Sequence, residues 1–211
     1  MVFASALMVE AVRQRVIGIV RTADAETAVR MADALIRGGL RSVEISLTNP
    51  GGLAAIGATA AAHPEAIVGA GSVLDGPSAV DAIRAGARFL VTPVTSRSTI
   101  AAAARYGVPV ISGAATPTEM FKAMRAGAAA VKLFPARGIA PQWVADVRAA
   151  LPQLPIVPTG GVEPDAAVSW LRAGAMAVAM GTALIRLLED DPTALSRLLQ
   201  EAAAIDGEAG R

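Results

Sequence analysis

The chain alternates between two hydrophobic patterns. An alanine-rich stretch runs up to a glycine, and a short apolar block rich in β-branched residues follows, as in AIRAGARFLVTPV and AMRAGAAAVKLFPA. The first pattern is typical of a helix that ends at a glycine. In the segment after the first apolar block, one helical face carries only apolar residues: Ala28, Ala32, Leu35 and Ile36. The apolar blocks do not alternate with polar residues, which indicates strands buried on both faces.

Eight apolar blocks are predicted as strands: residues 16–21, 42–47, 67–73, 89–94, 109–115, 130–136, 155–161 and 177–182. Strands that alternate with helices pair in parallel through helical crossovers, and eight such units close into a barrel. The alternative is an open doubly wound sheet, but no GxGxxG motif starts a helix after the first block. The predicted fold is therefore α/β, a single (β/α)8 TIM barrel with an N-terminal helix.

No shift in composition marks a second domain, so one domain is expected over residues 1–211, with a frayed tail from about residue 205. The start, MVFASALMVEAVRQR, lacks a charged segment before its apolar part and is predicted to be a helix rather than a signal peptide. No apolar run is long enough to span a membrane. These features predict a cytoplasmic protein without a membrane partner.

Composition excludes several classes of function. Hydrophobic residues make up 54% of the chain, which argues against disorder, and a net charge of +1 with 3% aromatic residues argues against nucleic-acid binding. The chain has no cysteine and one histidine. Disulfides and thiolate catalysis are therefore excluded, and neither a zinc enzyme nor a Ser-His-Asp hydrolase is expected. His63, which precedes a proline, is interpreted as a solvated loop residue rather than a ligand, and no cofactor or metal is predicted.

Lys132 is the first candidate for chemistry. Only two of the 19 basic residues are lysines; Lys122 lies in a helix-like segment, whereas Lys132 lies within the apolar block AAAVKLFPA. Burying a cation there is costly, and a lysine, unlike an arginine, can lose its proton and become a nucleophile. The alternative is a structural lysine that pairs with a core carboxylate. Because barrel active sites lie at the ends of strands, Lys132 is interpreted as functional.

Glu44 is the second candidate, since it interrupts the apolar strand SVEISL. Buried carboxylates are rare unless they are paired or catalytic. A pair with Lys132 would place a proton carrier beside an amine nucleophile, as Schiff-base chemistry requires. The alternative is a purely structural ion pair.

The third candidate is a phosphate site at the ends of the last two strands. PTGGVEP combines two glycines with a predicted helix start near Pro164, and MGTAL brings a second small-residue segment beside it. Backbone N–H groups at a helix N-terminus bind phosphate, and many barrels use these two loops for that purpose. The alternative is tight turn packing.

Six motifs in this order, VEISL, VGAGSVL, VTPV, ISGAATPTE, VKLFPA and PTGGV, resemble those of the 2-keto-3-deoxy-6-phosphogluconate (KDPG) aldolases. That family includes 2-keto-3-deoxy-6-phosphogalactonate and 4-hydroxy-2-oxoglutarate aldolases. The resemblance covers about residues 12–190 and implies a class I, metal-independent lyase that forms a homotrimer. Helix faces with many alanines and few charges, such as ATAAAH and TIAAAARYG, are compatible with subunit packing.

The resemblance also implies roles for individual residues. Lys132 matches the Schiff-base lysine and Glu44 the general acid/base. Pro93 and Phe134 match residues that line the pocket. The remaining matches are substrate and phosphate contacts: Arg21, Ser72, Thr159, Gly160, Gly161, Gly181 and Thr182.

Four positions bear on the substrate. Ser72 stands where the family more often has threonine, which keeps the hydroxyl. Thr48 stands where members that act well on hydroxyoxoglutarate tend to have arginine, which argues against that activity without deciding it. SLTNP resembles the phosphogalactonate branch, whereas Thr159 resembles the phosphogluconate branch.

The expected function is cleavage of the small-molecule substrate KDPG to pyruvate and glyceraldehyde 3-phosphate, a step of the Entner-Doudoroff pathway. Three alternatives remain open. They are cleavage of the phosphogalactonate epimer, a phosphate-binding isomerase or synthase without covalent catalysis, and a non-catalytic scaffold.

Overall fold

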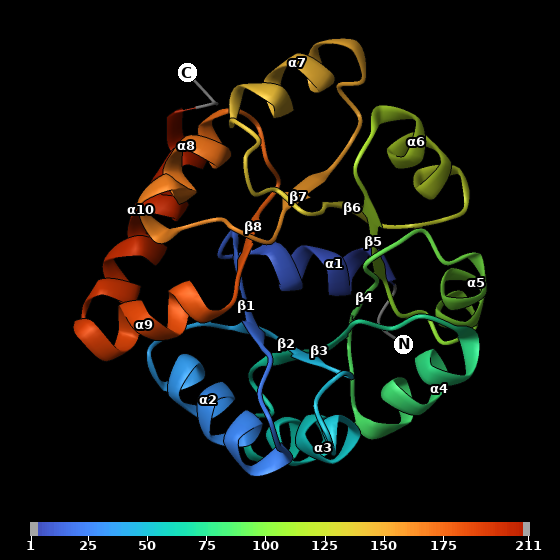
Figure 1. Cartoon of the computed structure of the whole chain (residues 1–211), viewed down its shortest axis with the longest axis vertical. Helices are drawn as coiled ribbons and strands as arrows, with labels where there is room; N and C mark the ends of the chain where they lie inside the picture. Colours follow the sequence, from blue (N-terminus) through green and yellow to red (C-terminus); the bar gives the residue numbers. More distant parts are fainter. Residues whose placement is uncertain (1–3, 209–211) are drawn as a thin grey trace.

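Eight parallel strands form the barrel that the hydrophobic pattern predicts (Figure 1). The computed structural model describes the backbone of residues 4–208 and the side chains of residues 4–205. The strands are β1 Val16–Val20, β2 Ser42–Ser46, β3 Ile67–Gly71, β4 Leu90–Val91, β5 Val110–Ala114, β6 Ala130–Leu133, β7 Ile156–Pro158 and β8 Val178–Met180. They follow the order β7-β6-β5-β4-β3-β2-β1-β8, and a bridge between Thr159 and Ala179 joins the two ends of the sheet. The prediction of a (β/α)8 barrel is confirmed.

Helices surround the strands as an outer ring (Figure 1). They are α2 Ala25–Arg37, α3 Gly52–Ala62, α4 Gly76–Ala85, α5 Arg97–Arg105, α6 Pro117–Arg125, α7 Gln142–Ala150, α8 Ala167–Arg172, α9 Thr182–Asp190 and α10 Ala194–Glu208, with the short 3₁₀ helix η1 Pro164–Ala166 before α8. Because α10 continues to Glu208, helix extends into the stretch expected to fray, and residues 209–211 lie outside the described part of the chain.

Side-chain caps fix where several of these helices begin. Asp24, Asp75, Ser96 and Thr116 each accept a hydrogen bond from the backbone N–H three residues later, at the starts of α2, α4, α5 and α6. Such caps satisfy donors that have no acceptor within the helix. They stabilise the helix starts on the side of the barrel where the strands end.

The predicted apolar face of α2 packs against the outside of the barrel. Ala28, Ala32 and Leu35 are fully buried, and Ile36 packs against the same core. The interior of the barrel holds a second apolar cluster at the end where the strands begin, and the N-terminal helix α1 Ala4–Val12 covers that end with Met8 and Ala11.

His63 differs from its prediction as a solvated loop residue. It forms the C-cap of α3, its side chain is only 13% exposed, and its two ring nitrogens lie 3.0 Å from an Asp33 oxygen and 3.4 Å from a Glu65 oxygen. The prediction was wrong because this loop packs against α2, where the Asp33 carboxylate contacts the His63 ring. Among the residues that the structure describes, no group of three or more His, Asp or Glu side chains is placed to hold a metal ion, and none of the helices is long and apolar enough to cross a membrane.

Candidate active site

Glycines create the space for the polar side chains inside the barrel. A Cβ atom at Gly71 of β3 would overlap the carboxylate of Glu44 on the neighbouring β2, and one at Gly113 of β5 would overlap the backbone of Pro93. Glu44 pairs in register with Gly69, whose missing side chain makes room for the Phe89 ring. The strand glycines therefore allow large side chains on adjacent strands to turn inward.

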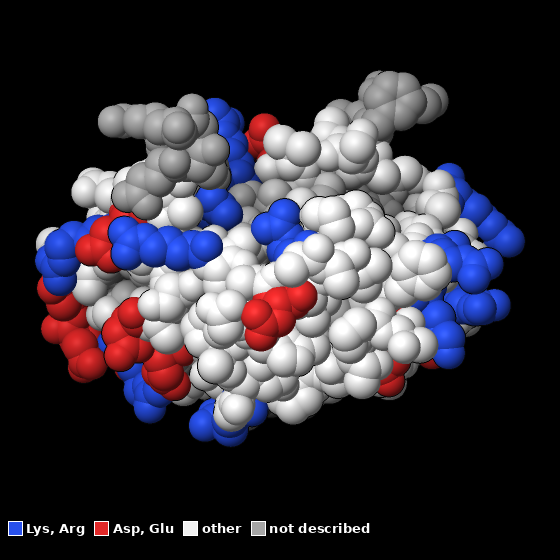
Figure 2. All heavy atoms as spheres, turned by 90° about the horizontal axis from the view of Figure 1, so that it is seen from above, with Lys and Arg blue, Asp and Glu red and all other residues white. Residues whose placement is uncertain are grey.

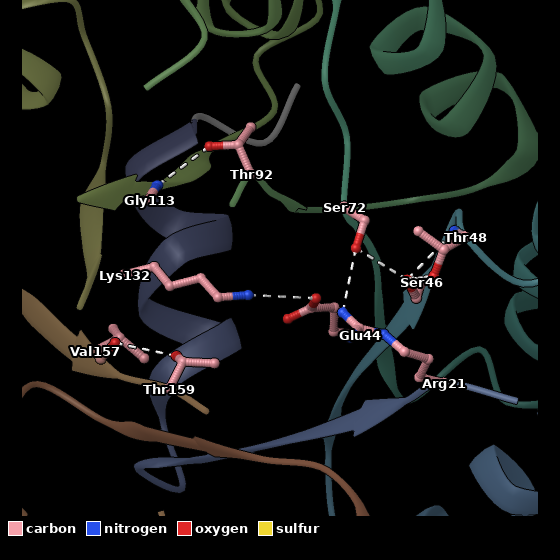
Figure 3. A network of polar contacts seen from close by, with 10 residues as sticks. All are labelled: Arg21, Glu44, Ser46, Thr48, Ser72, Thr92, Gly113, Lys132, Val157 and Thr159. Atoms are coloured by element: carbon pink, nitrogen blue, oxygen red, sulfur yellow. Dashed lines mark hydrogen bonds and ion pairs between the residues drawn. The ribbon is translucent and has the colours of Figure 1, made fainter. Parts of the chain in front are cut away.

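Lys132 and Glu44 face one another across this space (Figure 3). Both are buried, with 5% and 1% of their surface exposed, and the Lys132 Nζ lies 3.9 Å from the Glu44 Oε1. That Oε1 has no hydrogen-bond partner in the structure. Since 3.9 Å is an ion-pair distance and too long for a hydrogen bond, both groups retain the capacity to bond a third molecule between them.

A cavity of about 460 Å³ opens beside Lys132. Phe134 forms part of its wall, with its ring centre 5.1 Å from the Lys132 Nζ. Of the residues predicted for the site, eight line this cavity: Arg21, Lys132, Phe134, Thr159, Gly160, Gly161, Gly181 and Thr182. The structure thus brings together segments from β1, β6, β7 and β8 at the end of the barrel where the strands finish.

Ser72 connects Arg21 to a cluster of hydroxyl groups near Glu44 (Figure 3). The Arg21 Nη2 donates to the Ser72 Oγ at 3.4 Å, and the Ser72 and Ser46 hydroxyls lie 3.0 Å apart. Ser46 also lies 2.8 Å from the Thr48 hydroxyl. The Ser72 backbone is left-handed, with φ of +58°, a conformation that residues other than glycine rarely adopt. Strand β3 ends just before this residue. One cation and several hydroxyl donors at this end suit a carboxylate.

The glycines of PTGG, at the end of β7, also line the cavity. Gly160 and Gly161 both have positive φ, +82° and +87°. A Cβ at Gly161 would lie 2.7 Å from the Arg137 Cβ, so a side chain there would be strained and crowded. The predicted helix start near Pro164 is present: the 3₁₀ helix η1 begins there and leads directly into α8. The nearby α9 begins at Thr182, and the first N–H groups of a helix have no acceptor within it.

Thr159 and Pro93 have different surroundings. Thr159 is buried beside the cavity, and its hydroxyl donates to the Val157 carbonyl at 3.1 Å, which leaves the oxygen able to accept a further hydrogen bond. Pro93 follows β4 and contacts the backbone of β5, but it is not among the residues that line the cavity. Its predicted substrate contact stays a prediction.

Two other polar residues near strand ends are structural. Thr92 accepts a hydrogen bond from the Gly113 N–H at 3.2 Å and so links β4 to β5. Thr116 caps α6 in a capping box with Glu119. Both hydroxyls form hydrogen bonds that stabilise the fold, and neither residue lines the cavity.

Four polar residues of this end of the barrel were not predicted from the sequence: Ser46, Arg137, Glu163 and Arg186. The last three line the cavity, and Ser46 is fully buried, 3.0 Å from the Ser72 hydroxyl. Ser46 lies two residues after Glu44 on the same strand, so the period of two in a strand places both side chains on the inner face. That spacing is the signal by which it could have been found.

The comparisons with known proteins agree with this geometry. A family model described as "Aldolase: KDPG and KHG aldolase" matches residues 8–196. A 2-dehydro-3-deoxy-6-phosphogalactonate aldolase of Escherichia coli is 36% identical over 191 residues, which cover 89% of this chain and 91% of the relative. A 2-dehydro-3-deoxy-phosphogluconate aldolase of Pseudomonas aeruginosa is 38% identical over 148 residues, covering 70% of this chain and 66% of the relative.

Among solved structures, a cube-shaped, highly porous protein cage designed by fusing symmetric oligomeric domains matches with a TM-score of 0.83 and 30% identity, covering 92% of this chain and 75% of that one. The family model spans most of the barrel, including both Glu44 and Lys132. The chain therefore belongs to the KDPG and KHG aldolase family and is an aldolase, an enzyme of the lyase class.

Proposed function

We propose that the protein cleaves KDPG to pyruvate and glyceraldehyde 3-phosphate through a Schiff base on Lys132. The observation that carries the proposal is the buried Lys132 amine at the wall of a substrate-sized cavity, 3.9 Å from a carboxylate that has an unbonded oxygen. A structural ion pair would be expected to close to hydrogen-bond distance, because two buried charges gain from direct contact.

The first step is formation of the imine. The neutral Lys132 amine attacks the C2 ketone, and the carbonyl oxygen becomes a hydroxyl. Glu44 transfers the protons that allow this hydroxyl to leave as water, which produces a cationic iminium. The Phe134 ring lines the cavity beside the attacking amine, with its centre 5.1 Å from the Lys132 Nζ.

The second step breaks the C3–C4 bond. Glu44 takes the proton of the C4 hydroxyl, the C4–O bond becomes a carbonyl, and the electrons of the C3–C4 bond move to the iminium nitrogen through the new C2–C3 double bond. Glyceraldehyde 3-phosphate leaves. The enamine is then protonated at C3, and water hydrolyses the pyruvate iminium to release pyruvate and the Lys132 amine.

The two ends of the cavity suit the two anionic ends of this substrate. Arg21 and the Ser72 hydroxyl, near Glu44, would hold the C1 carboxylate, because a guanidinium and a hydroxyl both donate to carboxylate oxygens. The backbone of Gly160 and Gly161 and the start of α9 at Thr182 would hold the C6 phosphate. Phosphorylated sugar acids do not cross membranes freely, so the cytoplasm is the proposed location.

The phosphogalactonate epimer is the second candidate substrate. The phosphogalactonate aldolase matches over 89% of this chain and the phosphogluconate aldolase over 70%, which supports the second candidate. The two substrates differ in the direction of the C4 hydroxyl. The Thr159 hydroxyl oxygen lies beside the cavity and can still accept a hydrogen bond. A hydrogen bond to the C4 hydroxyl of one epimer would let it distinguish the two substrates.

The substrate is tested by assaying release of pyruvate and glyceraldehyde 3-phosphate from each epimer, with and without a metal chelator. We expect chelator-resistant cleavage, with phosphogluconate the better substrate and with Thr159→Val impairing that epimer more than the other. Preference for phosphogalactonate would select the second candidate. Cleavage of neither epimer, or loss of activity on chelation with rescue by a divalent ion, would contradict the proposal.

We also propose a homotrimer. Large apolar side chains are exposed on neighbouring segments, with Leu74 before α4, Val94 before α5 and Phe121 on α6. Separately, the view from the side of α7 shows a broad, mostly uncharged surface in which few acidic and basic side chains stand (Figure 2). Such surface is costly to leave in water. The related solved structure is described as built from symmetric oligomeric domains. Light scattering that shows a monomer at micromolar concentration would contradict this part of the proposal.

A further inference from the structure

The cavity carries more positive charge than the proposed chemistry uses. Its lining contains the four basic side chains Arg21, Lys132, Arg137 and Arg186, against one carboxylate, Glu163. The mechanism assigns Lys132 to the imine and Arg21 to the C1 carboxylate. Arg137 and Arg186 have no role in it, and both lie at the end of the cavity formed by the glycine pair.

Arg137 lies directly beside Gly161. A Cβ at Gly161 would lie 2.7 Å from the Arg137 Cβ and 3.0 Å from its Cα. The Ala136 N–H donates to the Thr159 carbonyl at 2.8 Å, which fixes the segment after β6 against the glycine pair. The base of the Arg137 side chain is therefore held in place, whereas its exposed guanidinium can extend toward an anion bound at the glycines.

Arg186 reaches the same end from α9. It lies four residues after Thr182, so the two side chains share one face of the helix, and both line the cavity. The Arg186 Nη2 lies 3.6 Å from the Glu163 Oε2, and both side chains are more than half exposed. An exposed pair at this distance contributes little to stability, so a phosphate dianion can compete for Arg186 at small cost.

We propose that Arg137 and Arg186 form a cationic clamp on the terminal phosphate of the substrate, and that Glu163 weakens this clamp by pairing with Arg186. The clamp rests on the proposed function, since it assumes that the phosphate lies at the glycine end of the cavity. It makes the two arginines specificity determinants for phosphorylated over unphosphorylated substrates. Glu163 has the opposite effect, because its carboxylate pairs with Arg186 and competes with the phosphate for that guanidinium.

The test uses the synthetic direction, in which pyruvate adds to an aldehyde. D-glyceraldehyde 3-phosphate and D-glyceraldehyde differ only in the phosphate, so the ratio of their kcat/KM values isolates its contribution. Arg137→Gln and Arg186→Gln are each expected to lower this ratio about tenfold, the usual effect of losing one hydrogen bond to a charged group. Arg105→Gln, on the exposed end of α5, is the matched control and should leave the ratio unchanged.

Glu163→Gln is expected to raise the ratio about two- to fivefold, since an exposed pair is worth at most about 1 kcal/mol. The gain should disappear in the Glu163→Gln/Arg186→Gln double variant, because Glu163 acts through Arg186. An unchanged ratio in both arginine variants, or a fall in the ratio for Glu163→Gln, would overturn the clamp. Trapping of pyruvate on Lys132 by borohydride, measured on the same variants, separates the two proposals: failure of trapping in the wild type would overturn the proposed function, whereas trapping with unchanged ratios would overturn the clamp alone.

Discussion

The two halves of the barrel interior are built in opposite ways. Where the strands begin, the interior is filled by apolar side chains such as Ile17 and Phe89, and α1 covers it with Met8. Where the strands end, glycines leave space that Glu44 and Lys132 occupy, and a cavity of about 460 Å³ opens to the outside.

Within one sheet, the half where the strands begin provides stability, and the half where they end provides the site for chemistry. Each strand passes through both halves, so the closed half fixes the positions of the strand ends while the open half can hold buried charges that cost stability. Lys132, for example, lies two residues after Ala130, which belongs to the closed half. Substitutions in the open half should therefore reduce turnover, and substitutions in the closed half should reduce stability.

The largest effect is expected for Lys132→Arg. An arginine keeps the positive charge but cannot lose its proton, so no imine can form. Turnover should fall on the order of 10⁴-fold or more, as when a nucleophile is removed. Steady-state assays should find Lys122→Arg, on the exposed face of α6, fully active. Substantial activity in Lys132→Arg would show that the lysine acts only through its charge.

Glu44→Gln should have the next largest effect, because the amide keeps the shape of the side chain and removes its proton transfer. The expected loss of kcat is about 10²–10⁴-fold, with a modest change in KM. Glu201→Gln, on the exposed surface of α10, provides the control. A Glu44→Gln enzyme with nearly normal kcat would reduce Glu44 to a structural partner of Lys132.

Phe89→Ala probes the closed half. Phe89 is fully buried against Gly69, and its truncation leaves a cavity that should lower the free energy of unfolding by about 3–5 kcal/mol in urea titrations. The kcat of the folded protein should stay within a few-fold of the wild type. A large loss of kcat with unchanged stability would contradict the division between the two halves.

The smallest effect concerns Asp191, outside both halves. Hydrogen bonds from Arg197 and then Thr193 lower the pKa of Asp191 from 3.8 to about 2. A carboxyl whose folded pKa is depressed stabilises the fold above its unfolded pKa, and the contribution is lost as the pH falls toward the folded value. Thermal melting should show Asp191→Asn less stable than the wild type by a constant margin above about pH 5. This difference in stability should shrink between about pH 5 and pH 2. A difference that does not depend on pH would show that the Asp191 charge is not its cause.

The barrel, Lys132 and Glu44 could be predicted from the sequence because each shows as a change in hydrophobicity between neighbouring residues. All eight apolar blocks contain a strand, although the strands are shorter than the blocks. Their ends depend on backbone geometry that the apolar pattern does not report: β3 stops before Ser72, at positive φ, and β7 stops before Gly160 and Gly161. Lys132 and Glu44 were found because a charged residue within an apolar strand is conspicuous.

The arginine clamp could not be predicted in the same way. Arg137 lies after the end of β6 and Arg186 on an exposed helix face, where charged residues are common. Only the packing of the segment after β6 and of α9 around the glycine pair brings them to one end of the cavity. His63 was misinterpreted for the same reason, since its partner Asp33 lies on α2, 30 residues earlier.

Borohydride reduction can capture the covalent imine that we propose between Lys132 and pyruvate. The protein is incubated with pyruvate and borohydride, digested, and mapped by peptide mass spectrometry. We expect irreversible loss of activity and a reduced pyruvate adduct on the peptide that contains Lys132. An adduct on Lys122 alone, or no adduct with activity retained, would contradict it.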